Sequence, residues 1–147
     1  MTSRFIEPTR ADEVFNGVVG LLTRVGLPLA GSRVLAVRGR SSGQWRTTPV
    51  NPLRVAGQRY LVAPRGQTQW VRNLRAAGSG ELRKGRGAEP FIATEVADAD
   101  KPPILRAYLK AWAWEVGRFF DGVDASSPDE RLAEIAPGFP VFRIEAE

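Results

Sequence analysis

The segment Gly39-Arg40-Ser41-Ser42-Gly43-Gln44-Trp45-Arg46-Thr47-Thr48-Pro49 is the most informative stretch of the chain. Its two glycines permit tight backbone geometry, and therefore a close approach of N–H groups to an anion. Four hydroxyl side chains and two arginines add hydrogen-bond donors and positive charge. The pattern predicts a strand–loop–strand unit that suits a phosphate or a polycarboxylate, with an ordinary polar hairpin as the alternative. It is not a Walker loop, because no GK[ST] triplet and no following helix occur.

Strand-like segments continue on both sides of this loop. They are Arg33–Val37, Trp45–Val55, Arg59–Ala63, a strand around Leu82 and Lys84, Glu89–Val96 and Phe139–Ile144. Two prolines in the second segment, Pro49 and Pro52, place it at a sheet edge or a bend. The short turns predict a mostly antiparallel sheet, so we expect an α+β fold, mainly β: a small barrel with helices packed outside.

Apolar spacing and capping residues predict four helices. The first spans Val14–Val25, ends at Gly26 and lies either on the core or at a membrane interface. The second starts at Thr68 and ends at Gly78. A third begins near Asp100-Lys101-Pro102-Pro103, and a short fourth follows the capping box Ser127-Pro128-Asp129-Glu130.

The amino-acid composition excludes several kinds of catalytic and metal site. The 147 residues include no cysteine and no histidine, which excludes disulfides, thiolate metal sites and Ser-His-Asp or Cys-His catalysis. No acidic cluster has metal-ligand spacing, so we expect no metal site. No stretch is long and apolar enough to span a membrane, and no signal peptide is evident, so we expect a cytoplasmic protein, peripheral to the membrane at most.

The positive charge is concentrated around the loop. Twelve basic residues and one acid, Glu81, lie between Gly31 and Gly87, a net charge of +11 against +5 for the whole chain. Of the 21 basic residues 18 are arginine, whose planar fork binds phosphates and carboxylates bidentately. The segment therefore predicts an anionic small-molecule partner. A nucleic-acid partner is not expected, because no recognition module is present and the aromatic residues do not interleave with the arginines.

Two further segments carry candidate functional residues. The stretch Ala63–Leu74 predicts a strand end, an Arg65-Gly66 turn and a helix N-terminus, which attracts anions. Trp70 and Asn73 share one face of that helix. The third predicted helix carries an aromatic stripe that we interpret mainly as core, with Tyr108 as a candidate proton donor.

Together these segments resemble the deazaflavin (F420)-dependent nitroreductases and F420H₂-dependent quinone reductases. The Gly-Arg-x-Ser/Thr-Gly-x-x-Arg pattern of that family is matched from Gly39 to Arg46, and its Trp-x-x-Asn-Leu pattern from Trp70 to Leu74. A strand ending in a small residue, then a basic residue and glycine, is matched by Ala63, Arg65 and Gly66. The resemblance covers roughly Ser32 to the C-terminus and implies a split β-barrel of the FMN-binding type.

The resemblance also implies a cofactor, coenzyme F420 with FMN as the alternative, and roles for particular residues. The loop would hold the phosphate and the glutamate tail through Arg40, Ser41, Ser42, Gly43, Gln44 and Arg46. The residues that would line the deazaflavin ring or the adjoining tail are Thr48, Pro49, Ala63, Pro64, Arg65 and Gly66. Trp70 and Asn73 would support the pocket from the helix.

Three departures from the family pattern are visible. Ser41 stands where lysine is frequent, and Phe119 and Phe120 stand in the region where nitro-reducing members place tyrosines. Two extra residues near Thr47-Thr48 separate Arg46 from Asn51-Pro52-Leu53, unless Pro49 takes the place of the family's proline. The first departure affects one charge contact, and the second prevents nitroimidazole reduction from being carried over.

The implied function is an F420H₂-dependent reductase that transfers a hydride to an electron-poor acceptor such as a quinone, an enone or a nitro compound. The alternative is a non-catalytic split barrel that binds a deazaflavin, a flavin or a lipid-like ligand. We expect one domain over residues 1–147, with an N-terminal helix and lead-in over 1–31 and the coenzyme-binding barrel over 32–147. A homodimer is also expected from the family.

Overall fold

The computed structural model describes residues 32–116, 119–120 and 122–147. The helix predicted over Val14–Val25 lies outside these residues. Within the described part, the strands and helices follow one another in nearly the order that the sequence predicts.

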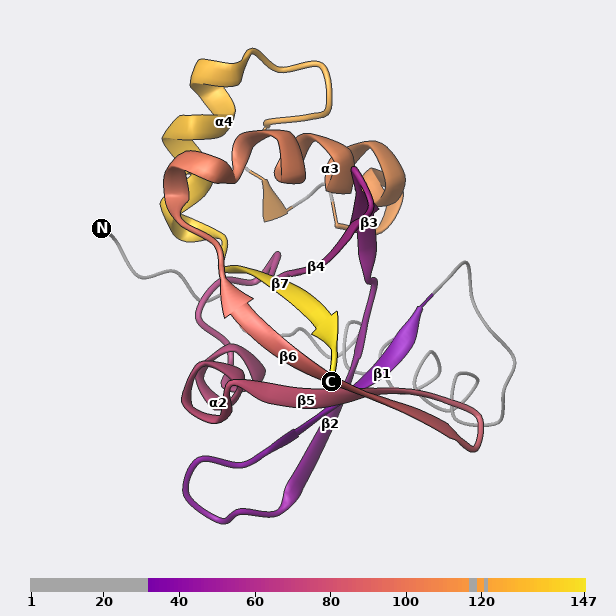
Figure 1. The fold of residues 1–147 in the computed structure, drawn as a ribbon. Helices are drawn as coiled ribbons and strands as arrows, with labels where there is room; N and C mark the ends of the chain where they lie inside the picture. Colours follow the sequence, from indigo (N-terminus) through magenta and orange to yellow (C-terminus); the bar gives the residue numbers. More distant parts are fainter. Residues whose placement is uncertain (1–31, 117–118, 121) are drawn as a thin grey trace.

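One antiparallel sheet forms the body of the protein. Its strands are β1 (Arg33–Arg38), β2 (Trp45–Val50), β3 (Leu53–Val55), β4 (Gln58–Val62), β5 (Ser79–Lys84), β6 (Gly87–Glu95) and β7 (Val141–Ala146). They are arranged in the order β2-β1-β5-β6-β7-β4-β3. The sheet curls but stays open between its two edge strands, β2 and β3 (Figure 1). It is therefore a half-barrel, as a split-barrel fold requires.

The two prolines of the second predicted strand explain its observed shape. The single predicted segment Trp45–Val55 is two strands, separated at Asn51-Pro52. Pro49 lies inside β2, which pairs only with β1 because it is an edge strand. A residue without an N–H is tolerated there, because no second neighbour needs its hydrogen bond. The predicted edge position and bend are both confirmed.

Helices and short 3₁₀ segments connect the strands. They are α2 (Gln69–Ala77), η1 (Asp98–Asp100), α3 (Pro102–Val116), α4 (Asp129–Ile135) and η3 (Ala136–Gly138). Gly78 ends α2 with a φ of 72°, and its N–H donates to the Leu74 carbonyl at 2.8 Å, so the predicted glycine stop is confirmed. Figure 1 shows α3 and α4 together over β3 and β4, with α2 beside β1 and β5.

The predicted capping box before α4 is wrong. The cap position of α4 is Pro128, and no side chain caps the helix. The Ser127 hydroxyl instead accepts the Asp124 backbone N–H at 3.0 Å. Ser126 donates both its N–H, at 2.8 Å, and its hydroxyl, at 2.7 Å, to the Asp124 carboxylate. These hydrogen bonds lower the pKa of Asp124 and form a turn that competes with the capping arrangement for the serine.

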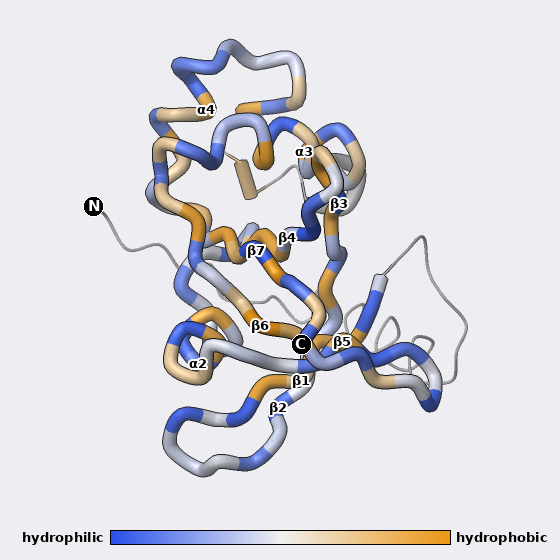
Figure 2. The backbone as a smooth tube through the Cα atoms, viewed as in Figure 1, coloured by the Kyte–Doolittle hydropathy of each residue, from blue (hydrophilic) through white to orange (hydrophobic). Residues whose placement is uncertain are grey.

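Alternating residues of β4 and β7 separate two hydrophobic clusters. On β4, Val62 faces the cluster under α3 and α4, while Leu61 faces the cluster inside the half-barrel. On β7, Val141 faces the first and Phe142 the second. Figure 2 shows the apolar colour along these strands and the polar colour at the β1–β2 loop. β4 and β7 thus contribute to a cluster on each face of the sheet, whereas the β1–β2 loop lies outside both clusters.

Candidate functional site

The β1–β2 loop is a closed turn rather than an open chain. The Gly39 N–H donates to the Gln44 carbonyl at 2.8 Å, and the Gly43 N–H donates to the Gly39 carbonyl at 2.9 Å. Gly43 has a φ of 72°, which side chains rarely permit. A Cβ at Gly39 would lie 2.8 Å from the Ser42 hydroxyl. Gly43 is therefore required by the backbone geometry of the loop, whereas a side chain at Gly39 would displace the Ser42 hydroxyl.

Asn73 connects this loop to α2. Its carboxamide oxygen accepts the Arg40 backbone N–H at 3.1 Å and the Arg40 Nη1 at 2.8 Å. The same Nη1 donates to the Gln69 side-chain oxygen at 2.9 Å. Asn73 is only 5% exposed, so its end of the connection is buried, whereas Arg40 is exposed. These bonds use only Nη1 of Arg40. Its Nε and Nη2 groups donate to neither Asn73 nor Gln69, so they are available to bind an anion.

Helix α2 is itself fixed to the sheet. Val71 and Leu74 bury their side chains in the cluster inside the half-barrel. On the exposed side, Arg75 makes a two-pronged ion pair with Glu95 of β6, at 2.8 and 2.7 Å. The hydrogen bond to Glu95 raises the pKa of the Arg75 guanidinium. The loop is therefore positioned by a helix that has contacts on both of its sides.

The turn after β4 carries the second predicted segment. Ala63 is fully buried, and its N–H donates to the Pro140 carbonyl at 2.9 Å. Gly66 is buried with a φ of 85°, and its N–H donates to the Ala63 carbonyl at 3.2 Å. Arg65 is half-buried and lies 4.6 Å from the ring centroid of Phe119. Pro64, which lies between Ala63 and Arg65 in the sequence, is also half-buried.

Thr68, at the start of α2, has a side-chain hydroxyl that is not hydrogen-bonded within the described residues. It occupies the cap position, but its hydroxyl makes no hydrogen bond to the helix. That hydroxyl is buried and has no hydrogen-bond partner among the described residues. A buried hydroxyl without a partner costs free energy that a ligand atom can recover. The predicted position of Thr68 is confirmed, and its predicted capping bond is wrong.

The remaining loop residues face in two directions. Register places Arg46 opposite Val37 and Thr48 opposite Leu35, on the side of the half-barrel interior. Pro49 lies opposite Val34, so it is on the other face of the sheet, away from the half-barrel interior. Ser41, Ser42, Gln44 and Arg46 are all exposed. The Ser42 hydroxyl accepts the Gln44 N–H at 3.2 Å and still has its own proton to donate.

Two aromatic candidates lie in the core clusters. Trp70 is half-buried in the half-barrel interior, where its ring lies 6.2 Å from that of Phe142. Tyr108 is 2% exposed in the cluster under α3, with the Phe120 ring 6.3 Å away. The structure thus brings Arg40, Asn73 and the α2 N-terminus together, but it places Tyr108 in the other cluster. Its role as proton donor stays a prediction.

The structure adds two contacts that the sequence does not indicate. Gln69 shares the Arg40 guanidinium with Asn73, and a four-residue spacing on α2 is the signal that could have indicated it. Phe119 lies against Arg65 although 54 positions separate them, which only the folded chain reveals. Phe119 is 6% exposed, so it closes one side of the Arg65 turn with an apolar ring.

Within the described residues, no group of three acidic, histidine or cysteine side chains could hold a metal ion. No helix in the part of the chain that the structure describes is long and apolar enough to cross a membrane.

Comparison with known proteins identifies the family. Residues 9–119 match the family described as F420H(2)-dependent quinone reductase. The chain belongs to this family. It is therefore an oxidoreductase, and its cofactor is coenzyme F420. Among curated proteins no sequence matches.

Solved structures agree on the split-barrel fold of this F420-dependent reductase. A structure described as a domain-swapped dimer has a TM-score of 0.56 at 18% identity, covering 92% of this chain and 96% of its own. An F420-H2 dependent reductase, FDR-A, has a TM-score of 0.53 at 18% identity, with 78% and 94% covered. A haem-binding protein from Mycobacterium smegmatis has a TM-score of 0.52 at 12% identity, with 97% and 53% covered. The predicted fold class, mainly β with a split barrel, is confirmed.

The residues present fit an anionic coenzyme. The loop offers exposed hydroxyls and a backbone that is fixed by Asn73, and Thr68 has a buried hydroxyl without a partner in the described chain. Arg46 is exposed and has no carboxylate partner within the described residues. A binding site of this kind holds a phosphate by hydrogen bonds and charge, and leaves the redox chemistry to the coenzyme.

Proposed function

We propose that this reductase transfers a hydride from reduced F420 to a quinone, and that residues 32–147 form its coenzyme-binding unit. When bound, reduced F420 supplies the hydride, and the quinone takes up that hydride together with a proton. The observation that supports the site is the Asn73 bridge, because it fixes the Arg40 backbone of an exposed, hydroxyl-rich loop. Enones and nitro compounds are the other acceptors of matching chemistry.

In this proposal the chain's own residues bind and orient the coenzyme. Arg40, Ser41, Ser42, Gly43, Gln44 and Arg46 would hold the phosphate and the anionic tail. Thr48, Pro49, Ala63, Pro64, Arg65 and Gly66 would lie along the ring or its adjoining tail, and Trp70 would support them from α2. The arginines supply bidentate donors, and the Thr68 hydroxyl gains a partner when a ligand atom reaches it.

The family supports a quinone as the acceptor, because its description is F420H(2)-dependent quinone reductase. Phe119 lies against Arg65 but is only 6% exposed, so its ring belongs to the core rather than to the surface that an acceptor meets. Burial of Tyr108 favours solvent as the source of the proton, because a side chain that is 2% exposed has little access to an acceptor.

The test uses the purified protein with oxidised and reduced F420. We expect quenching of F420 fluorescence at micromolar protein, and oxidation of reduced F420 when a quinone is added. FMN serves as the competing cofactor, and an enone and a nitroaromatic serve as competing acceptors. Absence of F420 binding at tens of micromolar would disprove the site, while binding without turnover of any acceptor would favour a carrier of the coenzyme.

We also propose that the protein forms a homodimer. The domain-swapped dimer shares the fold over 92% of this chain, which supports an assembly of two copies. Two large apolar side chains are exposed on the described surface, Ile92 and Trp45. A dimer that covers either of them would bury apolar surface, which favours association.

A further inference from the structure

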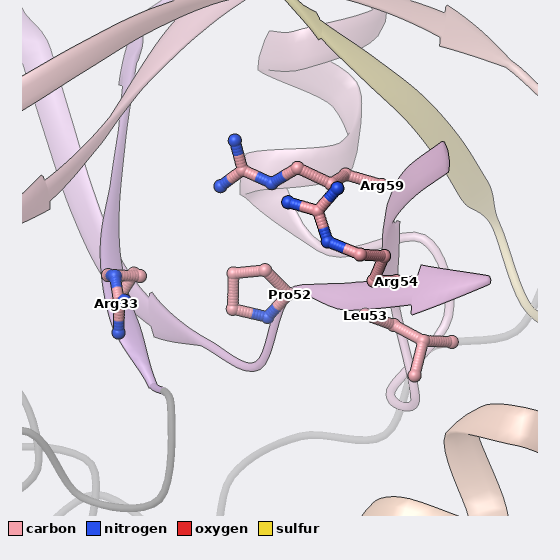
Figure 3. Close-up of a pocket in the computed structure, with 5 residues that line it drawn as sticks. All are labelled: Arg33, Pro52, Leu53, Arg54 and Arg59. Carbon is pink, nitrogen blue, oxygen red and sulfur yellow. The ribbon is translucent and has the colours of Figure 1, made fainter. Parts of the chain in front are cut away.

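A second cluster of arginines lies at the end of β1 that is remote from the β1–β2 loop. Arg33, Arg54 and Arg59 line a hollow of about 190 Å³ together with Pro52 and Leu53. Figure 3 shows the Arg54 and Arg59 side chains extending from neighbouring strands into the same space, with Arg33 on the other side of Pro52. Arg33 and Arg38 lie five positions apart on β1, about 16 Å at about 3.3 Å per residue. The hollow is therefore distinct from the loop.

Strand register explains why these charges converge. Arg54 pairs directly with Arg59 across β3 and β4. Arg59 alternates with Leu61, and Arg33 alternates with Leu35, so all three arginines face the half-barrel interior. Leu53 belongs to the other cluster and points to the opposite face. The three guanidiniums therefore surround the open end of the half-barrel, between its two edges.

The positive charge in the hollow is only partly balanced. Arg59 is ion-paired with Glu89 at 2.8 Å, and Glu89 is 49% exposed. Within the described residues, neither Arg33 nor Arg54 has a carboxylate partner; Arg33 donates to the Ser32 carbonyl. Like charges directly opposite each other on adjacent strands are destabilising. The Arg54–Arg59 pair thus carries a cost that a bound anion would remove.

We propose that this hollow binds a multiply charged oxyanion, either a phosphate group or paired carboxylates. Three guanidiniums from three strands can each donate two hydrogen bonds to such a group. The hollow, at about 190 Å³, has room for a diphosphate or a small dicarboxylate. The anion would replace the missing partners of Arg33 and Arg54.

The same interior side of the sheet connects the hollow to the loop. On β2, Arg46, Thr48 and Val50 alternate along that side, and Val50 lies opposite Arg33. Arg46 and Val50 lie four positions apart, about 13 Å along the strand. The oxyanion can therefore come from either of two sources: a free anion, or the charged end of a long ligand that is held at the loop.

The experiment is a calorimetric titration with sodium pyrophosphate at fixed ionic strength. We expect binding that weakens at least tenfold in Arg54→Gln and in Arg33→Gln. The matched control is Arg86→Gln, which removes one exposed arginine at the β5–β6 turn and should leave the affinity unchanged. If Arg46→Gln weakens binding and Arg54→Gln does not, the anion is bound at the loop and the proposal is wrong.

A thermal melt separates binding from folding defects. Without anion, Arg54→Gln should melt at or above the temperature of the parent protein, because the substitution removes the like-charge pair. Pyrophosphate should raise the melting temperature of the parent and of Arg86→Gln, but not that of Arg54→Gln. An equal rise in all three proteins would overturn the proposal. Neither measurement involves F420, so its outcome is independent of the proposed function.

A competition experiment identifies the source of the anion. If saturating F420 displaces pyrophosphate, and Arg54→Gln also weakens F420 binding, the hollow receives the charged end of the coenzyme. If pyrophosphate and F420 bind together and Arg54→Gln leaves F420 affinity unchanged, the hollow takes a free oxyanion. Both results require the anion site, whereas unchanged pyrophosphate binding in Arg54→Gln excludes it.

Discussion

At the scale of single residues, Asn73 has the clearest functional consequence. We expect Asn73→Ala to weaken F420 binding about tenfold, because it leaves the Arg40 N–H without its acceptor and releases the loop, at a cost of about 1–3 kcal/mol. Fluorescence titration measures the affinity. The control is Gln69→Ala, which removes one exposed contact to Arg40 and should cost less. Equal affinity in both variants would contradict the role of Asn73 as a positioning residue.

Lys101 shows the opposite case, a buried charge that serves the fold. It is 3% exposed, pairs with Asp98 at 2.7 Å and donates to the Ala136 carbonyl at 3.1 Å, so it joins η1 to η3. We expect Lys101→Met to lower the free energy of unfolding by about 1–3 kcal/mol, since the buried carbonyl loses its donor. Urea denaturation measures this loss. F420 affinity should stay at the parent value, and a selective loss of affinity would contradict a purely structural role.

At the scale of elements, Gly80 shows how closely β5 approaches β1. A Cβ at this position would lie 2.8 Å from the Ala36 carbonyl oxygen and 3.0 Å from the Phe91 ring. The carbonyl belongs to the backbone of a central strand and cannot move aside easily. We expect Gly80→Ala to destabilise the protein by about 1–3 kcal/mol. Ser79→Ala, at the adjacent exposed position, is the control, and similar melting temperatures for the two variants would contradict the steric argument.

The same elements show what sequence reasoning can predict. Periodicity, glycine stops and prolines predict the strands and α2, because these signals act over a few residues. The capping box at Ser127 failed, since Asp124 offers the serines a competing turn that lies outside the motif. The loop motif predicted an anion site, but its anchor, the Arg40–Asn73 bridge, spans 33 positions. Contacts of this kind, like that of Arg65 with Phe119, depend on the packing of whole elements.

At the scale of the whole molecule, the open half-barrel constrains how two copies can meet. Both free edges are protected against strand pairing: β2 contains Pro49, and β3 has only three residues. Edge-to-edge pairing is therefore disfavoured, which leaves an apolar contact or an exchange of elements as routes to a dimer. Ile92 on β6 is 51% exposed and is, with Trp45, one of the two large apolar residues exposed on the described surface.

These two routes differ in a measurable way. Light scattering should give about 32 kDa, twice the chain mass of 16.1 kDa, at tens of micromolar. If the dimer rests on an apolar contact, Ile92→Arg should convert it to a monomer. If elements are exchanged, the mass should survive that substitution, and labelled copies should mix only slowly, because the swap requires partial unfolding. A mass of one chain at every concentration would contradict the dimer by either route.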